Sequence, residues 1–249
     1  MKLFLDKRIF LLVCINAALY VFIVILDVMN AFDSITPSMG HFCDAMKYAA
    51  IISCLLICVF AYSRSRERTP LIQMIVFSVT LGADFFLLFT PYFVAGVFVF
   101  IAAHTCALIR YKPRWSPFVG AASASVFILA LYLAPRILHS NSEITLFIAV
   151  TGAYAVLIIS VAISTFFAPQ PRVNTLFSRF GMCLFIACDI NVLIFNAIPA
   201  GATPHTASIF LMWLFYLPAQ TLLALSACKW QTKADTEASN LGGQADQYS

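Results

Sequence analysis

Hydrophobic residues along the chain fall into long runs that are separated by short polar segments. Each run is long enough to cross a bilayer as a helix, which takes about 20 predominantly apolar residues. Because the connecting segments are short, neighbouring helices are expected to be antiparallel and adjacent. The pattern therefore predicts an all-α fold, a polytopic membrane bundle of eight transmembrane helices. The expected ranges are about 9–29, 45–62, 69–90, 92–109, 115–134, 143–167, 175–198 and 206–228.

Composition agrees with this class and places the domain boundary. Of the 249 residues, 62% are hydrophobic and only 10% are charged, whereas soluble domains carry about 25% charged residues. We expect one transmembrane domain over residues 1–229. Residues 230–249 are polar and small, which is typical of a disordered cytoplasmic tail.

Basic residues predict the orientation in the membrane. Of the 15 lysines and arginines, 13 lie on one side of the predicted bundle, and the exceptions are Lys47 and Arg136. The positive-inside rule then puts both termini in the cytoplasm. The expected location is the cell membrane, which is the cytoplasmic (inner) membrane if the organism is bacterial. Because topology explains the basic residues, nucleic-acid binding has no support.

Two carboxylates inside apolar runs need an explanation. Asp84 lies in the third predicted span and Asp189 in the seventh. A charged side chain at the centre of a span costs at least about 2.5–3.5 kcal/mol on insertion scales, so such residues are usually functional. Two structural alternatives remain open: Asp84 could form an ion pair with Lys47, and Asp189 could bridge helices through hydrogen bonds.

Further polar residues occur at similar depths in the predicted spans. His104 is expected near the midplane with Asp189, Lys47 within the first turn or so of the outer end of its span, and Gln220 closer to the cytoplasm. Asn196 shares a helix face with Asp189, which it could orient unless it caps the helix end. His104 could equally be a packing residue, and Tyr216 with Gln220 could be helix contacts. Their convergence with the two acids favours a site in a cavity that opens outward or into the lipid.

A short sequence echo suggests an internal repeat. The predicted span after Asp84 contains Ala103-His104-Thr105, and the span after Asp189 contains Ala219-Gln220-Thr221. If the echo is real, the bundle is a four-plus-four duplication.

Paired buried acids support a specific chemistry. Burial disfavours the ionised form of a carboxyl group, and a second carboxylate nearby disfavours it further, so one acid can stay protonated while its partner is ionised. Such pairs hydrolyse acetal-like bonds, with one group donating a proton and the other activating water. The sequence contains no metal-binding motif, serine-hydrolase elbow or nucleotide-binding loop, so no cofactor is expected.

At these residues the chain resembles the lysoplasmalogenase (YhhN-like) family of eight-span membrane proteins. The resemblance rests on short motifs in the same order as in the family. They are Lys47, the segment from Gly82 to Leu88 with Asp84, Gly96 to His104, Tyr154, Gly181 to Asp189, and Phe215 to Ser226 with Tyr216 and Gln220. Three positions depart from the family pattern: Ala83 before the first acid, Cys188 before the second, and Pro218 in the last motif.

The resemblance implies hydrolysis of the vinyl ether of lysoplasmalogens to a fatty aldehyde and glycerophosphocholine or glycerophosphoethanolamine. It implies Asp84 and Asp189 as the catalytic acids, Lys47 near the phosphate headgroup, and His104, Tyr154, Asn196, Tyr216 and Gln220 as supporting residues. The partners would be a lysophospholipid substrate and membrane lipid, and the oligomeric state stays open. Two other functions also fit buried acids in a bundle: a proton-coupled transporter of small molecules or lipids, or a catalytically inactive lipid-binding protein of the same fold.

Overall fold

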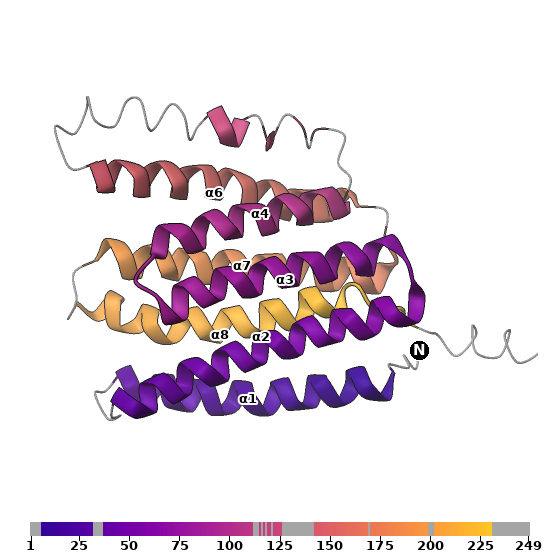
Figure 1. The fold of residues 1–249 in the computed structure, drawn as a ribbon, viewed down its shortest axis with the longest axis horizontal. Helices are drawn as coiled ribbons and strands as arrows, with labels where there is room; N and C mark the ends of the chain where they lie inside the picture. The colour runs from indigo at the N-terminus through magenta and orange to yellow at the C-terminus, as the bar shows by residue number, and fades with distance from the viewer. Residues whose placement is uncertain are drawn as a thin grey trace, which may run out of the picture.

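The structure is a computed structural model, and it contains seven long helices. It describes residues 6–31, 37–111, 115, 117, 119–120, 122–125, 142–168, 170–198 and 202–230. The helices lie roughly along the long axis of the molecule (Figure 1). They are α1 (Lys7–Ala31), α2 (Pro37–Ser65), α3 (Arg68–Phe89), α4 (Phe93–Tyr111), α6 (Ser142–Phe167), α7 (Arg172–Ala197) and α8 (Thr203–Leu225).

All seven helices are long and apolar enough to cross a membrane, and they match seven of the eight predicted spans. The predicted span 115–134 falls mostly outside the described residues, as does the tail from residue 231 on. Phe93 at the start of α4 packs on Phe147 near the start of α6, with ring centroids 5.7 Å apart. The two helices therefore begin at the same end of the bundle, which is the relation that an intervening span predicts.

The outer surface of the bundle is apolar. Large side chains such as Phe10, Leu11, Phe167 and Phe180 are more than half exposed. In water such a surface would be unfavourable, but in a bilayer the lipid chains solvate it. We conclude that the protein is a multi-pass membrane protein, and charged residues such as Asp27, Lys47 and Asp84 are buried in its interior.

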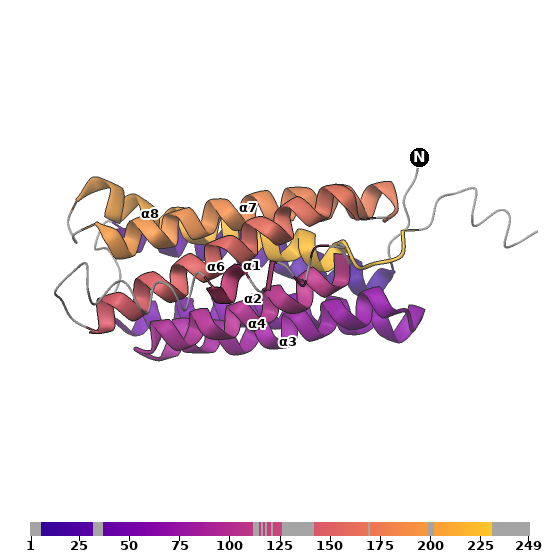
Figure 2. The same ribbon diagram turned by 90° about the horizontal axis from the view of Figure 1, so that it is seen from above.

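The helices close into a ring. Packing contacts join α1 to α2, α2 to α3, α3 to α4, α4 to α6, α6 to α7, α7 to α8, and α8 back to α1. Helix α2 also touches α8. In the perpendicular view, α7 and α8 lie on one side of the bundle and α3 and α4 on the other (Figure 2). This arrangement brings polar residues that are far apart in sequence toward one interior.

Helix α2 begins earlier than predicted, at Pro37 instead of about residue 45. Lys47 is therefore more than two turns inside the helix and only 7% exposed, so the expectation of a position within its first turn was wrong. Asp27, which lies within α1, is also buried, at 2% exposed.

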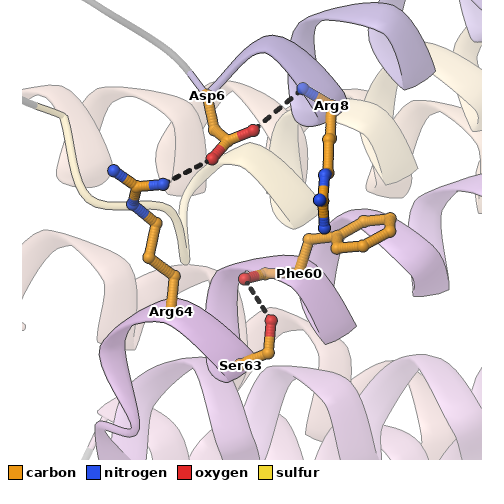
Figure 3. Close-up of polar contacts among 5 residues, drawn as sticks. All are labelled: Asp6, Arg8, Phe60, Ser63 and Arg64. Atoms are coloured by element: carbon orange, nitrogen blue, oxygen red, sulfur yellow. Dashed lines mark hydrogen bonds and ion pairs between the residues drawn. The ribbon is translucent and has the colours of Figure 1, made fainter.

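Both ends of the described chain meet at one end of the bundle. Asp6 accepts a hydrogen bond from the backbone N–H of Arg8 (2.8 Å) and pairs with Arg64 of α2 (2.7 Å), while Arg8 stacks over Phe60 (Figure 3). Ser63 donates to the carbonyl of Phe60 at 3.0 Å. At the other end of the sequence, Lys229 pairs with Glu67 of the α2–α3 link at 2.7 Å. Termini on one side are what the charge pattern requires, and the cytoplasmic assignment of that side stays a prediction.

Candidate active site

Asp84 and Asp189 line the same cavity, although 105 residues separate them in the sequence. The cavity has a volume of about 340 Å³ and lies between α2, α3, α4, α7 and α8. Asp84 is 3% exposed, and Asp189 is only partly buried. The other lining residues are Asp44, Lys47, Leu87, Leu88, Phe93, Phe100, Cys188, Val192, Phe195, Asn196, Met212, Trp213 and Tyr216.

Each carboxyl group accepts a hydrogen bond from a buried tyrosine on another helix. The Tyr216 hydroxyl of α8 lies 2.8 Å from both Oδ1 and Oδ2 of Asp84. The Tyr154 hydroxyl of α6 donates to Oδ2 of Asp189 at 2.7 Å. These contacts fix the orientation of both acids, and they link α3 to α8 and α6 to α7 through polar groups at the interior of the bundle.

Pro218 stands two residues after Tyr216, inside α8. A proline within a helix has no N–H to donate, and it leaves the carbonyl four residues earlier without its helical partner. That carbonyl belongs to Leu214, and the Tyr20 hydroxyl of α1 donates to it at 3.1 Å. Helix α8 therefore accommodates this departure from the family pattern with a compensating bond, and Tyr216 keeps its place beside Asp84.

A second cavity of about 300 Å³ adjoins the first and is almost entirely apolar. It lies mainly between α4, α6 and α7. The two cavities share six lining residues, namely Leu87, Phe93, Phe100, Asp189, Val192 and Asn196. Of the two acids, Asp189 lines both cavities and Asp84 lines the first. Asp189 is thus at the junction between the cavity that contains Lys47 and Asp84 and an almost entirely apolar one.

Lys47 forms an ion pair with Asp27, in which the ammonium nitrogen is 2.7 Å from Oδ1. A longer contact of 3.8 Å reaches Asp44, and the Trp213 ring lies 5.0 Å from the ammonium group. The ion pairs of Lys47 thus go to Asp27 and Asp44, and the sequence-based alternative of a Lys47–Asp84 pair was wrong. Asp44, Lys47 and Trp213 line the first cavity, and Asp27, which does not line it, pairs with Lys47 from α1.

His104 and Gln220 line a separate void of about 20 Å³, which neither acid lines. His104 Nδ1 is 3.0 Å from the Phe100 carbonyl, and its ring packs edge-on against Tyr154 and Phe185. His104 thus buttresses Tyr154, and does not line either of the two large cavities. Asn196 lines both cavities, but its amide donates to the Val192 carbonyl at 2.8 Å.

Two glycines of the sequence motifs allow close helix approach around the acids. A Cβ atom on Gly96 of α4 would lie 2.7 Å from Leu87 Cδ2 and 3.3 Å from the Ala83 carbonyl oxygen of α3. A Cβ atom on Gly181 of α7 would lie 2.9 Å from Leu223 Cγ of α8. The helices that carry Asp84 and Asp189 can therefore approach α4 and α8 closely because Gly96 and Gly181 have no side chain.

Sequence reasoning missed Asp27 and Trp213. The signal for Asp27 was present, because Lys47 is a basic residue inside a predicted span and Asp27 is an acid at a comparable depth in the preceding one. Trp213 gave no signal, since an aromatic residue in an apolar run is most often packing. Among the described residues, no group of three or more histidine, cysteine or acidic side chains is arranged to hold a metal ion.

The fold and the site together define a helical multi-pass membrane protein in which two aspartates from different helices line one cavity. The model of the YhhN family matches residues 44–227, which is most of the chain, and the chain belongs to this family. No curated protein and no solved structure matches it significantly.

Proposed function

We propose that this protein is a lysoplasmalogenase-like hydrolase. It would cleave the vinyl ether bond of lysoplasmalogens, giving a fatty aldehyde and glycerophosphocholine or glycerophosphoethanolamine. The observation that carries the proposal is the shared cavity: two carboxyl groups from α3 and α7 line one space, and this space adjoins an apolar cavity at Asp189. Membership of the YhhN family supports the same reaction class.

The shape of the combined cavity suits a single-chain lipid. The almost wholly apolar cavity between α4, α6 and α7 can take the hydrocarbon chain. The cluster around Lys47 offers both signs of charge to a zwitterionic headgroup. Because an ammonium carries three N–H donors, Lys47 retains donors for a phosphate while it is paired with Asp27. The vinyl ether, which lies between chain and headgroup, would then lie beside the two acids.

The reaction needs one acid that donates a proton and one carboxylate that accepts one. The protonated acid delivers its proton to the β-carbon of the alkenyl group, and the double-bond electrons form that C–H bond, which leaves an oxocarbenium ion. The carboxylate stabilises this cation and removes a proton as a water oxygen bonds to the α-carbon. In the resulting hemiacetal the C–O bond to glycerol breaks. The leaving oxygen takes the proton from the second acid, the hydroxyl proton returns to the first, and both acids are restored.

Tyr154 and Tyr216 hold the two carboxyl groups in position by hydrogen bonds. Fixed orientation matters because a reacting group must stay within about 3–3.5 Å of its target atom. His104 supports Tyr154 through ring packing. These residues are positioning groups in the proposal, and proton transfer is assigned to the aspartates.

The test is aldehyde release by purified protein in detergent, where no ion gradient exists. The expected result is that each lysoplasmalogen molecule yields one fatty aldehyde and one molecule of glycerophosphocholine or glycerophosphoethanolamine. The matched control substrate is the saturated alkyl ether lysolipid, which has no double bond to protonate and should not react. A protein that binds both lipids and hydrolyses neither would contradict the proposal and favour a carrier or an inactive lipid-binding protein.

A further inference from the structure

The surroundings of the two acids differ, and we infer that Asp189 is the proton donor while Asp84 is the carboxylate that faces the cationic intermediate. This assignment rests on the proposed function, which leaves open which acid holds the proton. It follows from three features of the site: the hydrogen bonds, the burial, and the cavities that each side chain lines.

Asp84 has the hydrogen-bond geometry of an anion. The Tyr216 hydroxyl is equidistant from both carboxyl oxygens, at 2.8 Å each. An ionised carboxylate only accepts hydrogen bonds, and its two oxygens are equivalent, so it matches a single donor placed between them. A protonated carboxyl has one O–H and one C=O oxygen, so its two oxygens are not equivalent partners for a single hydroxyl group. Asp84 is 3% exposed, and its contact with Tyr216 holds it in a fixed position.

Asp189 has the geometry of a donor. Among the described residues, Tyr154 is its hydrogen-bond partner, and it engages Oδ2 alone. Oδ1 is thus the oxygen that can carry a proton toward a ligand. Asp189 is also the less buried of the two acids, so it is the one that a substrate carbon can approach.

The cavities point to the same assignment. Asp189 lines the apolar cavity, where its neighbours are side chains such as Ile186, Ile190 and Leu193. Apolar surroundings suit a neutral carboxylic acid, as in other enzymes that use two carboxyl groups in different roles, and Asp84 does not line this apolar cavity. The alkenyl carbons of a lipid lie on the chain side of the ether oxygen. An acid at the start of the chain cavity is therefore beside the β-carbon that must be protonated.

A binding experiment separates the two roles without any turnover. The probe is a single-chain lysolipid in which a secondary ammonium replaces the ether oxygen, so that it carries the charge of the oxocarbenium ion. The reference ligand is the saturated ether lysolipid of the same length. A hydrogen bond to a charged group corresponds to roughly tenfold to hundredfold in affinity, so wild-type protein should prefer the ammonium lipid by about this factor.

The assignment predicts that Asp84→Asn abolishes this preference and that Asp189→Asn retains it. Asp6→Asn, at the opposite end of the bundle, is the matched control and should retain it too. Thermal unfolding of each variant shows whether the fold is kept. Loss of the preference in Asp189→Asn, in both aspartate variants or in neither overturns the assignment. If only Asp84→Asn loses the preference but the wild-type protein releases no aldehyde, Asp84 is the anionic group of the site, while the proposed reaction fails and with it the donor role of Asp189.

Discussion

Removing the ammonium group of Lys47 should strongly destabilise the protein, and Lys47→Met tests this. In the wild-type protein the Lys47 and Asp27 side chains are 9% and 2% exposed, and their charged atoms are 2.7 Å apart. Asp27 Oδ2 has no hydrogen-bond partner among the described residues, and Oδ1 has only Cys43 Sγ at 3.6 Å besides Lys47. Lys47→Met would leave this carboxylate nearly uncompensated. Breaking a buried pair from one side costs about 3–5 kcal/mol.

A cost of this size corresponds to a fall in Tm of roughly 6–20 °C for a chain of this length. The assay is thermal unfolding in detergent with a thiol-reactive fluorophore. Five of the eight cysteines are buried in the folded protein, namely Cys43, Cys54, Cys58, Cys188 and Cys228. Their reaction with the dye therefore reports loss of the fold.

The double variant Asp27→Leu/Lys47→Met is the control. It removes both charges and fills the space with apolar groups, and such replacements are often neutral or stabilising. Its Tm should return to within a few degrees of wild type. If Lys47→Met alone leaves Tm unchanged, or if the double variant is the less stable of the two, the ion pair does not act as described.

Three further predictions follow from other parts of the bundle. Gly96→Leu should lower both Tm and activity because even its Cβ would press on Leu87 of the helix that carries Asp84. The control Gly82→Ala should be tolerated, since its Cβ would meet Val99 at an ordinary 3.8 Å. Circular dichroism melts and turnover of both variants check this. Tyr20→Phe should lower the free energy of unfolding by about 1–3 kcal/mol because it leaves the Leu214 carbonyl unpaired. The loss should be smaller in a Pro218→Ala background, where the backbone N–H of residue 218 can donate to this carbonyl. Unfolding of wild type, the two single variants and the double variant measures the difference. A single cysteine at Glu67, on a cysteine-free background, should resist a membrane-impermeant reagent in intact cells while one at Tyr92 reacts, and the reverse labelling would mean that the predicted orientation is inverted.

Much of the fold could be predicted from the sequence because each helix that crosses a bilayer needs a long hydrophobic run. The positions of these runs therefore indicate where the helices lie in the sequence. Seven predicted spans correspond to described helices. The start of α2 was missed because residues such as His41 and Asp44 interrupt the apolar run, yet the helix continues through them. Hydropathy does not distinguish a polar residue in a protein-lined cavity from one in a loop.

The site was predictable in part. Asp84 and Asp189 stood out because each is an acid in an apolar run, and their depths along the helices suggested proximity. Depth does not give the rotation of a helix, so the sequence did not show that Lys47 turns toward Asp27, or that Tyr154 and Tyr216 each bind one acid. The four-plus-four repeat and the roles of the supporting residues stay predictions.

The central claim is that two aspartates in one cavity carry out vinyl-ether hydrolysis, and turnover of their asparagine variants tests it most directly. Asparagine keeps the shape of aspartate but neither donates the proton nor carries the negative charge. General acid–base catalysis contributes about 10²–10⁴-fold to the rate. Asp84→Asn and Asp189→Asn should therefore each lower kcat for lysoplasmalogen by about 10²-fold or more, while Tm stays near that of the wild-type protein. A folded Asp189→Asn or Asp84→Asn variant that releases aldehyde at the wild-type rate would contradict the account.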